Sequence, residues 1–391
     1  MALEKSRQEQ YSRKVEEHFP DRLAIIDYER FYKVLEEEFR SMGLEDAGIV
    51  RIIKKAERES LALNFIKALS LRYGENPGQP AAFYCEKGAY GSNMAELEVL
   101  LEGSKGLGYI NLADMDLGQR IVRKLNGIFP EKKICAMIKH EMPSAVAIGD
   151  SSLVFEKAWD SDSLSNFGSV DVFNYEIDES DAKTLAESRK NIEVVYAPGF
   201  TDKALEILSS RKPLRAVKMK EMKEPTFDYN DEYKRVAGGL LVQMRYDSKI
   251  ISPKSVEVIS QRKPSPDEMD AAIFNWIVCG FTRSNAVVIG QKDKTHGIGS
   301  GQRSRIDSAE NAIRLSKRGY GSQGCVLASD AYMPFPDVVD LAADNGITSI
   351  IYPLGSNKDE EVLKRADERG LAMIITRKKG DADSERCFLH R

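Results

Sequence analysis

Short apolar runs alternate with amphipathic stretches along most of the chain, and this alternation begins near residue 66. The apolar runs include KICAMIK, IEVVYAP, AVVIG, CVLAS and SIIYP. The amphipathic stretches include FTDKALEILSSR, SAENAIRLSKR and DEEVLKRADERG. Short apolar runs are typical of buried strands, whereas apolar residues at helical spacing are typical of helices that cover a sheet. The pattern therefore predicts an α/β protein.

The first 65 residues have a different pattern, rich in Glu, Lys and Arg, with apolar residues at helical spacing at Phe31, Val34, Leu35 and Phe39. This spacing predicts a small helical extension or a dimer-packing element. A polar stretch with four prolines, near 220–265, predicts a connecting region with one or two strands. We therefore expect a helical extension at 1–65, an α/β domain at 66–220, a connecting region at 221–265 and a second α/β domain at 266–391.

Composition narrows the class of function. With 391 residues, of which 42% are hydrophobic, the chain can bury more than one core. The 57 Lys and Arg nearly balance the 61 Asp and Glu, which argues against a general nucleic-acid binder. No apolar stretch reaches the length of a membrane helix, and MALEKSRQEQ lacks an apolar signal core, so we expect a soluble, cytoplasmic protein. The five cysteines form no C-x-x-C pair, which predicts no zinc or disulfide framework. Four of them sit in or beside apolar runs, which predicts core residues.

Two segments place basic residues at the end of an apolar run. In LRYGENPGQ, Arg72 and Tyr73 precede a turn, where a guanidinium can grip a phosphate or carboxylate. A structural arginine in a surface loop is the simpler alternative. In KICAMIKHEMPSAVAIG, Lys139 and His140 end a strand, so one group can stabilise charge while the other moves a proton. The alternative there is a solvated pair at a strand end.

Three further segments carry polar groups in apolar surroundings. Asn285 lies at the start of a predicted strand, and a glycine-rich turn after that strand leads to Arg305 and a helix. Such a turn can bind an anion with its backbone N–H groups, or it can be purely structural. This turn is neither a Rossmann fingerprint nor a Walker A loop. After Ser329 and Asp330, a stiff apolar segment precedes Asp337. It could form one side of a pocket for a flat ring. The alternative is that its aromatic residues only stabilise the start of a helix. The terminal SERCFLHR has apolar residues between charged ones, which predicts that this end of the chain packs against the rest of the protein.

Together these segments resemble the transformylase domain of the bifunctional purine-biosynthesis family, which formylates aminoimidazole carboxamide ribonucleotide (AICAR). LRYGENPGQ resembles L-R-Y-G-x-N-P-H-Q, IKHEMP resembles K-H-x-x-P, and SDAYMPFPD resembles S-D-A-F-F-P-F-x-D. Similar matches are RSNAVV, GIGSGQRSR and RCFLH, together with YINLAD, NFGSV, EVVYAPGF and GGLLVQ. The matches keep their order and cover about residues 66–391. The resemblance does not extend to residues 1–65.

The resemblance implies two cytidine-deaminase-like α/β domains and transfer of a formyl group from 10-formyltetrahydrofolate, as co-substrate, to the amino group of AICAR. It implies a homodimer and no metal in the chemistry. It also implies a stand-alone transformylase, because no room remains for the cyclohydrolase domain; ring closure to inosine monophosphate would then need another protein. Lys139 and His140 would be the catalytic pair, with His140 as base and Lys139 stabilising the oxyanion or protonating the departing nitrogen.

Binding roles also follow from the resemblance. The nucleotide would be bound by Arg72, Tyr73, Asn111, Gly168, Glu193, Asn285, Arg305, Arg386, Phe388 and His390. The pteridine of the folate would lie against Tyr332, Met333 and Pro334, with Asp337 on its polar edge.

The sequence departs from the family pattern at several places. Gly78 stands where the family usually has His, Met142 to Ala145 replace the usual N-P-C-G context, and Arg283 stands where Lys or Gln is commoner. These changes leave open a different formyl donor. Two other functions are alternatives. One is a zinc deaminase, whose H-x-E and P-C-x-x-C motifs are missing from the sequence, and the other is a non-catalytic AICAR-binding protein.

Overall fold

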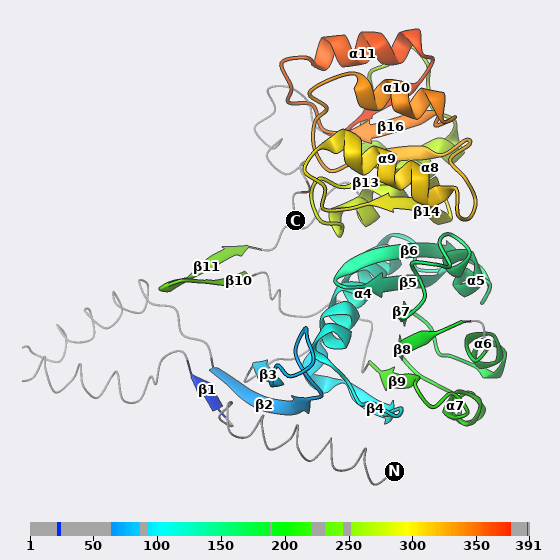
Figure 1. Cartoon of the computed structure of the whole chain (residues 1–391). Helices are drawn as coiled ribbons and strands as arrows, with labels where there is room; N and C mark the ends of the chain where they lie inside the picture. The colour runs from blue at the N-terminus through cyan, green and yellow to red at the C-terminus, as the bar shows by residue number, and fades with distance from the viewer. Residues whose placement is uncertain are drawn as a thin grey trace, which may run out of the picture. The chain divides into compact units, whose positions relative to one another are not determined.

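A computed structural model describes residues 22–24, 64–86, 93–187, 190–219, 231–244, 252–376 and 389, and all structural statements below concern these residues. The chain divides into two compact units. Their helices and strands are labelled in Figure 1. The first contains Met1–Glu96 and Gly106–Tyr109, and the second contains Leu97–Lys105 and Ile110–Arg391. Each unit is described by itself.

The first unit is built on a three-stranded antiparallel sheet. Its strands are β1 (Arg22–Ala24), β2 (Asn64–Leu71) and β3 (Ala81–Glu86), followed by a short 3-10 helix, η1 (Met94–Glu96). β1 falls within the extension that was predicted to be helical, so that prediction is wrong for these three residues, which pair with β2 instead. The rest of residues 1–63 lies outside the described residues, and the helical assignment there stays a prediction.

The second unit contains a twelve-stranded mixed sheet in the order β12-β17-β16-β15-β13-β14-β6-β5-β7-β8-β9-β4. The strands are β4 (Glu98–Leu101), β5 (Lys133–Lys139), β6 (Met142–Gly149), β7 (Ser169–Phe173), β8 (Ile192–Ala197), β9 (Arg215–Lys218), β12 (Glu257–Val258), β13 (Val287–Gln291), β14 (Lys294–Gly299), β15 (Val326–Ser329), β16 (Ser349–Tyr352) and β17 (Ala372–Ile375). The helices are α4 (Tyr109–Ile128), α5 (Val154–Trp159), α6 (Glu179–Leu185), α7 (Asp202–Ser209), α8 (Pro266–Gly280), α9 (Arg305–Ser316), α10 (Asp337–Asp344) and α11 (Asp359–Glu368). The predicted α/β class is confirmed.

The elements of this unit follow the same order twice. The first series is α4, the β5–β6 hairpin, α5, β7, α6, β8, α7 and β9; the second is α8, the β13–β14 hairpin, α9, β15, α10, β16, α11 and β17. In each series the last three strands are parallel neighbours. This repeated order supports an internal duplication of the unit. The predicted domain boundaries and the likeness to cytidine deaminases stay predictions.

The first series forms the first half of this unit and the second series forms its second half. They join through β6 and β14, which run antiparallel with Ala147 opposite Lys294. The Ile148 N–H donates to the Asp293 carbonyl at 2.8 Å, and the Val146 N–H donates to Thr295 Oγ1 at 3.0 Å. The two halves therefore share one continuous sheet.

Helix α8 illustrates how local sequence signals fix an element. Ser265 Oγ accepts from the Glu268 N–H, the Glu268 carboxylate accepts from the Ser265 N–H, and Pro266 begins the helix. This is a capping box with proline at the first helical position, which satisfies amide groups that the helix itself cannot pair. The following apolar residues are buried, including Trp276 at 0% exposure. A single capping residue of this kind contributes about 1 kcal/mol.

Each half has its own cluster of buried apolar side chains. The cluster of the first half includes Met137, Phe155 and Phe173, and that of the second half includes Leu327 and Tyr352. Each fully buried large apolar side chain contributes about 1.5–3 kcal/mol to folding. Three of the five cysteines are buried in the interior, as predicted for core residues; they are Cys135, Cys279 and Cys325.

The region predicted to connect the two domains carries three described strands rather than one or two. β10 (Asp231–Val236) and β11 (Gly239–Met244) form a hairpin, and β12 follows a short 3-10 helix, η2 (Pro253–Ser255), to pair with β17. At the other end of the chain, Leu389 is 2% exposed, and its N–H donates to the Asp330 carbonyl at 3.0 Å. The predicted docking of this terminus is confirmed at Leu389. Across the described ranges, no helix is both long and apolar enough to span a membrane.

Candidate active site

Loops from both halves meet at one edge of the large sheet. β5 ends at Lys139 and runs antiparallel to β7, so the start of β7 lies at the same edge. β6 leaves that edge antiparallel to β14, and therefore β14 ends there at Gly299. β13 begins and β15 ends at this edge too, because Val287 pairs with both Gly299 and Ser329. The register thus brings together segments that are more than a hundred residues apart.

Lys139 and His140 lie at a tight hairpin turn on this edge. Lys139 pairs with Met142, so His140 and Glu141 form a two-residue loop, with φ angles of 55° and 58°. Positive φ at both positions is typical of the hairpin turn whose twist matches the strands, and Asn-Gly is its usual sequence. A residue with a Cβ pays roughly 1–2 kcal/mol to adopt this conformation. The imidazole of His140 belongs to an exposed residue beyond the strand rather than to the strand itself.

Asp114, on α4, holds the backbone of this turn. Its Oδ2 accepts from the His140 N–H at 3.1 Å and its Oδ1 accepts from the Glu141 N–H at 2.5 Å. The residue is 3% exposed, and burial raises the pKa of its carboxyl to about 7 against the opposing effect of these two bonds. The charges of Glu141 and Glu193 also raise it. Asp114 was not among the predicted site residues.

Lys139 lies close to Gly168. Its Nζ donates to the Phe167 carbonyl at 2.5 Å, and a Cβ at Gly168 would lie 4.0 Å from that Nζ. Gly168 has φ of 85°, a conformation that glycine adopts without strain, and its N–H donates to the Asn191 carbonyl at 2.6 Å. A larger residue at 168 would strain the backbone, because its φ is positive.

Two predicted nucleotide-binding residues also pair at this edge. Asn111 Nδ2 donates to the Glu193 carboxylate at 3.0 Å, and Arg215 lies 3.6 Å from the same carboxylate. Asn111 is on α4, one turn before Asp114, while Glu193 is near the start of β8. The first half therefore gathers Lys139, His140, Asn111, Gly168 and Glu193 within one group.

The second half contributes a mostly buried polar group around Arg305. Its guanidinium donates to Asn285 Oδ1 at 3.0 Å and to Ser329 Oγ at 2.8 Å, and it forms an ion pair with Asp330. Asn285 Nδ2 donates to the Gln302 carbonyl at 3.0 Å. Arg305 is 9% exposed and Asp330 is fully buried. Here Asn285 and Arg305 bind each other, so nucleotide contacts by them would require these bonds to be shared or exchanged.

A side-chain ion pair joins the two groups. Arg283 Nη2 lies 3.1 Å from the carboxylate of Glu141, the second residue of the turn. The Arg283 carbonyl accepts from the Gly301 N–H at 2.9 Å, within the glycine-rich turn. The turn that carries His140 is therefore connected directly to the segment that leads to Asn285.

The predicted folate-binding segment follows Asp330. Tyr332 is 40% exposed and Pro334 is exposed, whereas Met333 is fully buried in the core of the second half. Asp337 is exposed and begins α10, where its Oδ1 accepts from the Val338 N–H at 2.8 Å. The exposed aromatic and carboxylate could meet a ring, but the buried Met333 contributes packing here.

Arg72 and Tyr73 lie in the first unit, at the end of β2. The guanidinium carbon is 4.8 Å from the centroid of the Tyr73 ring, and the Arg72 N–H donates to the Leu107 carbonyl at 3.1 Å. Arg386, Phe388 and His390 lie outside the described residues. Their predicted roles stay predictions.

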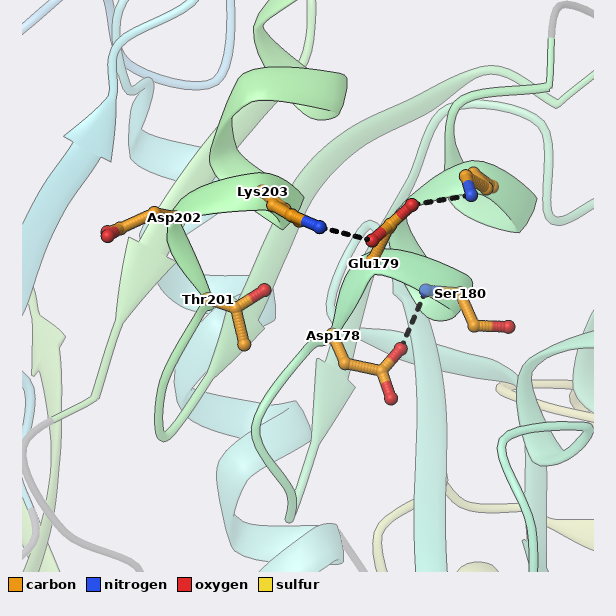
Figure 2. A pocket seen from close by; sticks show the side chains of 7 residues that line it. Asp178, Glu179, Ser180, Thr201, Asp202 and Lys203 are labelled. Atoms are coloured by element: carbon orange, nitrogen blue, oxygen red, sulfur yellow. Dashed lines mark hydrogen bonds and ion pairs between the residues drawn. The ribbon is translucent and has the colours of Figure 1, made fainter.

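A separate hollow of about 560 Å³ lies at the other ends of β7 and β8, where α6 and α7 begin (Figure 2). Its lysines are both occupied, since Glu179 pairs with Lys183 at 2.6 Å and with Lys203 at 3.4 Å. None of the predicted site residues lines it. Within the described residues, no group of three or more His, Cys, Asp and Glu side chains is arranged to hold a metal ion.

The sequence of the chain is similar to those of a known protein family. Residues 7–315 match the family described as AICARFT/IMPCHase bienzyme. The chain belongs to this family. It is 41% identical over 331 residues to the bifunctional purine biosynthesis protein PurH of Sorangium cellulosum (strain So ce56), an alignment that covers 82% of this chain and 60% of that relative. The chain thus spans less than two thirds of the relative's length. The match begins at residue 7, so the expectation that the resemblance excludes residues 1–65 is wrong.

Proposed function

We propose that this chain transfers a formyl group from 10-formyltetrahydrofolate to the amino group of AICAR. The observation that carries the proposal is the hairpin turn itself. It presents the exposed residue His140 directly after Lys139, the last residue of β5, at the edge where the polar groups of both halves meet. The membership of the family and the order of its motifs along the chain support the same reaction.

The chemistry requires both a base and a cationic group. The amino group of AICAR is a weak nucleophile because its lone pair is delocalised, so a proton must leave as its nitrogen attacks the formyl carbon. His140 would accept that proton, and Lys139 would stabilise the oxyanion of the tetrahedral intermediate. When the bond from carbon to the folate nitrogen breaks, that nitrogen takes a proton from Lys139 or His140. No covalent bond to the protein is needed.

The substrates would lie on either side of this turn. The nucleotide would be held by the group of Asn111, Gly168 and Glu193 and by Asn285 and Arg305. The pteridine would lie against Tyr332 and Pro334, with Asp337 at its edge. We also propose a cytoplasmic homodimer, in which a second copy completes the folate and nucleotide sites.

The deciding experiment incubates the purified chain with AICAR and 10-formyltetrahydrofolate, and in parallel with AICAR, formate and ATP. We expect formyl-AICAR and tetrahydrofolate from the first mixture. Product from the second mixture alone would show that the formyl donor is made from formate and ATP and is not 10-formyltetrahydrofolate. No product from either mixture would overturn the proposal. The same samples report ring closure, and inosine monophosphate is not expected, because the motifs quoted for this chain are those of the transformylase.

A further inference from the structure

The hairpin turn at His140 has an unusual sequence for its backbone. Both turn residues have positive φ, yet neither is Gly, Asn or Asp, the residues that adopt this conformation most easily. The turn is also at the exposed rim of the sheet, where packing alone constrains it little. A contact from elsewhere in the fold must therefore favour this backbone.

Asp114 supplies that contact. Its two carboxylate oxygens each accept one N–H of the turn, from His140 at 3.1 Å and from Glu141 at 2.5 Å. These amide groups lie outside the hairpin ladder, whose last pair is Lys139 with Met142. Carboxylate bonds to N–H groups are about twice as strong as neutral ones, and the bidentate geometry restricts both peptide planes.

The position of Asp114 also connects the turn to the rest of the site. It is on α4, three residues after Asn111, which donates to Glu193 at 3.0 Å. Residues three apart lie on the same face of a helix. One rigid helix therefore holds both the turn and the residues proposed to bind the nucleotide.

We infer that Asp114 is a positioning residue, whose carboxylate holds the His140–Glu141 backbone in the left-handed conformation and so directs the imidazole toward the nucleotide. The catalytic part of this inference rests on the proposed function. The hold on the turn does not, because it follows from the two hydrogen bonds alone.

Hydrogen exchange of the unmodified protein tests the hold. The His140 and Glu141 amides belong to a turn at the edge of the sheet, where unpaired amides exchange rapidly. We expect both to be strongly protected, measured by mass spectrometry on peptides spanning residues 138–143. Exchange of both amides at the rate of an unpaired turn would overturn the inference, whether or not the protein forms formyl-AICAR.

A matched set of variants tests the effect on catalysis. Asp114→Asn keeps the shape of the side chain but offers only one acceptor oxygen, and we expect kcat to fall by about 100-fold, the scale of a misplaced catalytic group. The KM for AICAR should change by less than about threefold, because Asp114 does not contact the nucleotide in this arrangement. A merely structural residue would lower the amount of folded protein and leave kcat per folded molecule unchanged.

Substitution of Glu141 separates positioning from acid-base chemistry. Glu141→Gly and Glu141→Ala both lose the carboxylate, but only glycine adopts positive φ without strain. In the Asp114→Asn background, the Gly variant should therefore have a kcat roughly tenfold above that of the Ala variant. Equal kcat values would mean that Asp114 acts by something other than holding the backbone. If Asp114→Asn does not fold, the exchange measurement on the unmodified protein still decides the question.

Discussion

Arg283 and Glu141 form an ion pair at 3.1 Å that joins the His140–Glu141 turn of the first half to the segment that enters β13 in the second half. Both side chains are partly exposed, and each neutralises the charge of the other beside the site. A chain with only one of them would leave a charged group beside the site without its partner.

The ion pair should therefore couple in a double-mutant cycle. Arg283→Ala and Glu141→Ala should each lower kcat/KM about fivefold, and the double variant should be no worse than either, because both remove the same contact. The unfolding free energy should change by less than about 1 kcal/mol, since both side chains are partly exposed.

Lys292→Ala is the matched control for this cycle. Lys292 forms a similarly exposed pair with Asp267 at 2.8 Å, near the turn of the β13–β14 hairpin and away from the site edge. Its loss should leave kcat/KM unchanged. Fully additive effects of Arg283 and Glu141 would show that their contact does not matter for activity.

His140→Ala should lower kcat by at least ~100-fold, the usual scale for loss of a positioned acid or base. Binding of AICAR, measured by titration calorimetry, should persist, because the proposed nucleotide contacts come from other residues. Lys132→Ala is the control, since Lys132 lies just before β5 at the opposite edge and pairs with Asp150 at 2.6 Å. A near-normal kcat in the His140 variant would assign the base elsewhere.

Asp171 should make stability depend on pH. It is fully buried in β7, and burial raises the pKa of its carboxyl to about 7, despite the bond that Ser169 Oγ donates at 2.5 Å. Its other oxygen has no hydrogen-bond partner among the described residues. The folded state thus binds a proton that the unfolded state releases near pH 4, so the unfolding free energy falls as the pH rises from about 4 to about 7.

Asp171→Asn should remove this contribution. The difference between the two unfolding curves, measured by denaturant titration from pH 5 to 8, should change by about 1.4 kcal/mol for each pH unit crossed below 7. Asp114 titrates in the same sense and remains in both proteins, so only the difference is informative. Ser169→Ala should extend the fall to higher pH, because its hydroxyl stabilises the charged carboxylate. Parallel curves for Asp171→Asn and the unmodified protein would contradict the assignment.

Gly299 should be required for packing rather than for binding an anion. A Cβ at this position would overlap the carbonyl of Ser308, because α9 lies directly on β14. Gly299→Ala should lower the unfolding free energy by about 1–3 kcal/mol, the usual cost of overpacking. Gly239→Ala is the control, since the nearest atom to its Cβ would be 3.9 Å away. Thermal melts of the two variants compare them, and an unchanged melting temperature for Gly299→Ala would contradict the packing role.

The sequence predicted the α/β class and the strand that ends at Lys139, because both depend on local periodicity. It did not identify Asp114, whose partners lie 26 and 27 residues away and meet it only through the fold. A signal existed, since Asp114 interrupts the apolar face of an amphipathic helix that also presents Leu117 and Ile121. An acidic residue on a buried helix face usually has a specific partner.

The glycine-rich turn illustrates the opposite limit. Its composition suits an anion-binding turn as well as a turn that packs closely against a helix. The overlap that a Cβ at Gly299 would make with the Ser308 carbonyl favours the close packing. The pairing of Asn285 with Arg305 was likewise hidden, because it depends on which strand ends share an edge. Sheet order and register are long-range properties, so spacing along the chain could not supply them.

The hydrogen-bonded junction of β6 and β14 has a consequence for how ligands enter. A hinge motion that separates the two halves would break backbone hydrogen bonds such as that between Ile148 and Asp293. We therefore expect ligands to enter and leave by rearrangement of the loops at this edge of the sheet. Probes attached to the two halves of the sheet should therefore report one distance, the same before, during and after turnover.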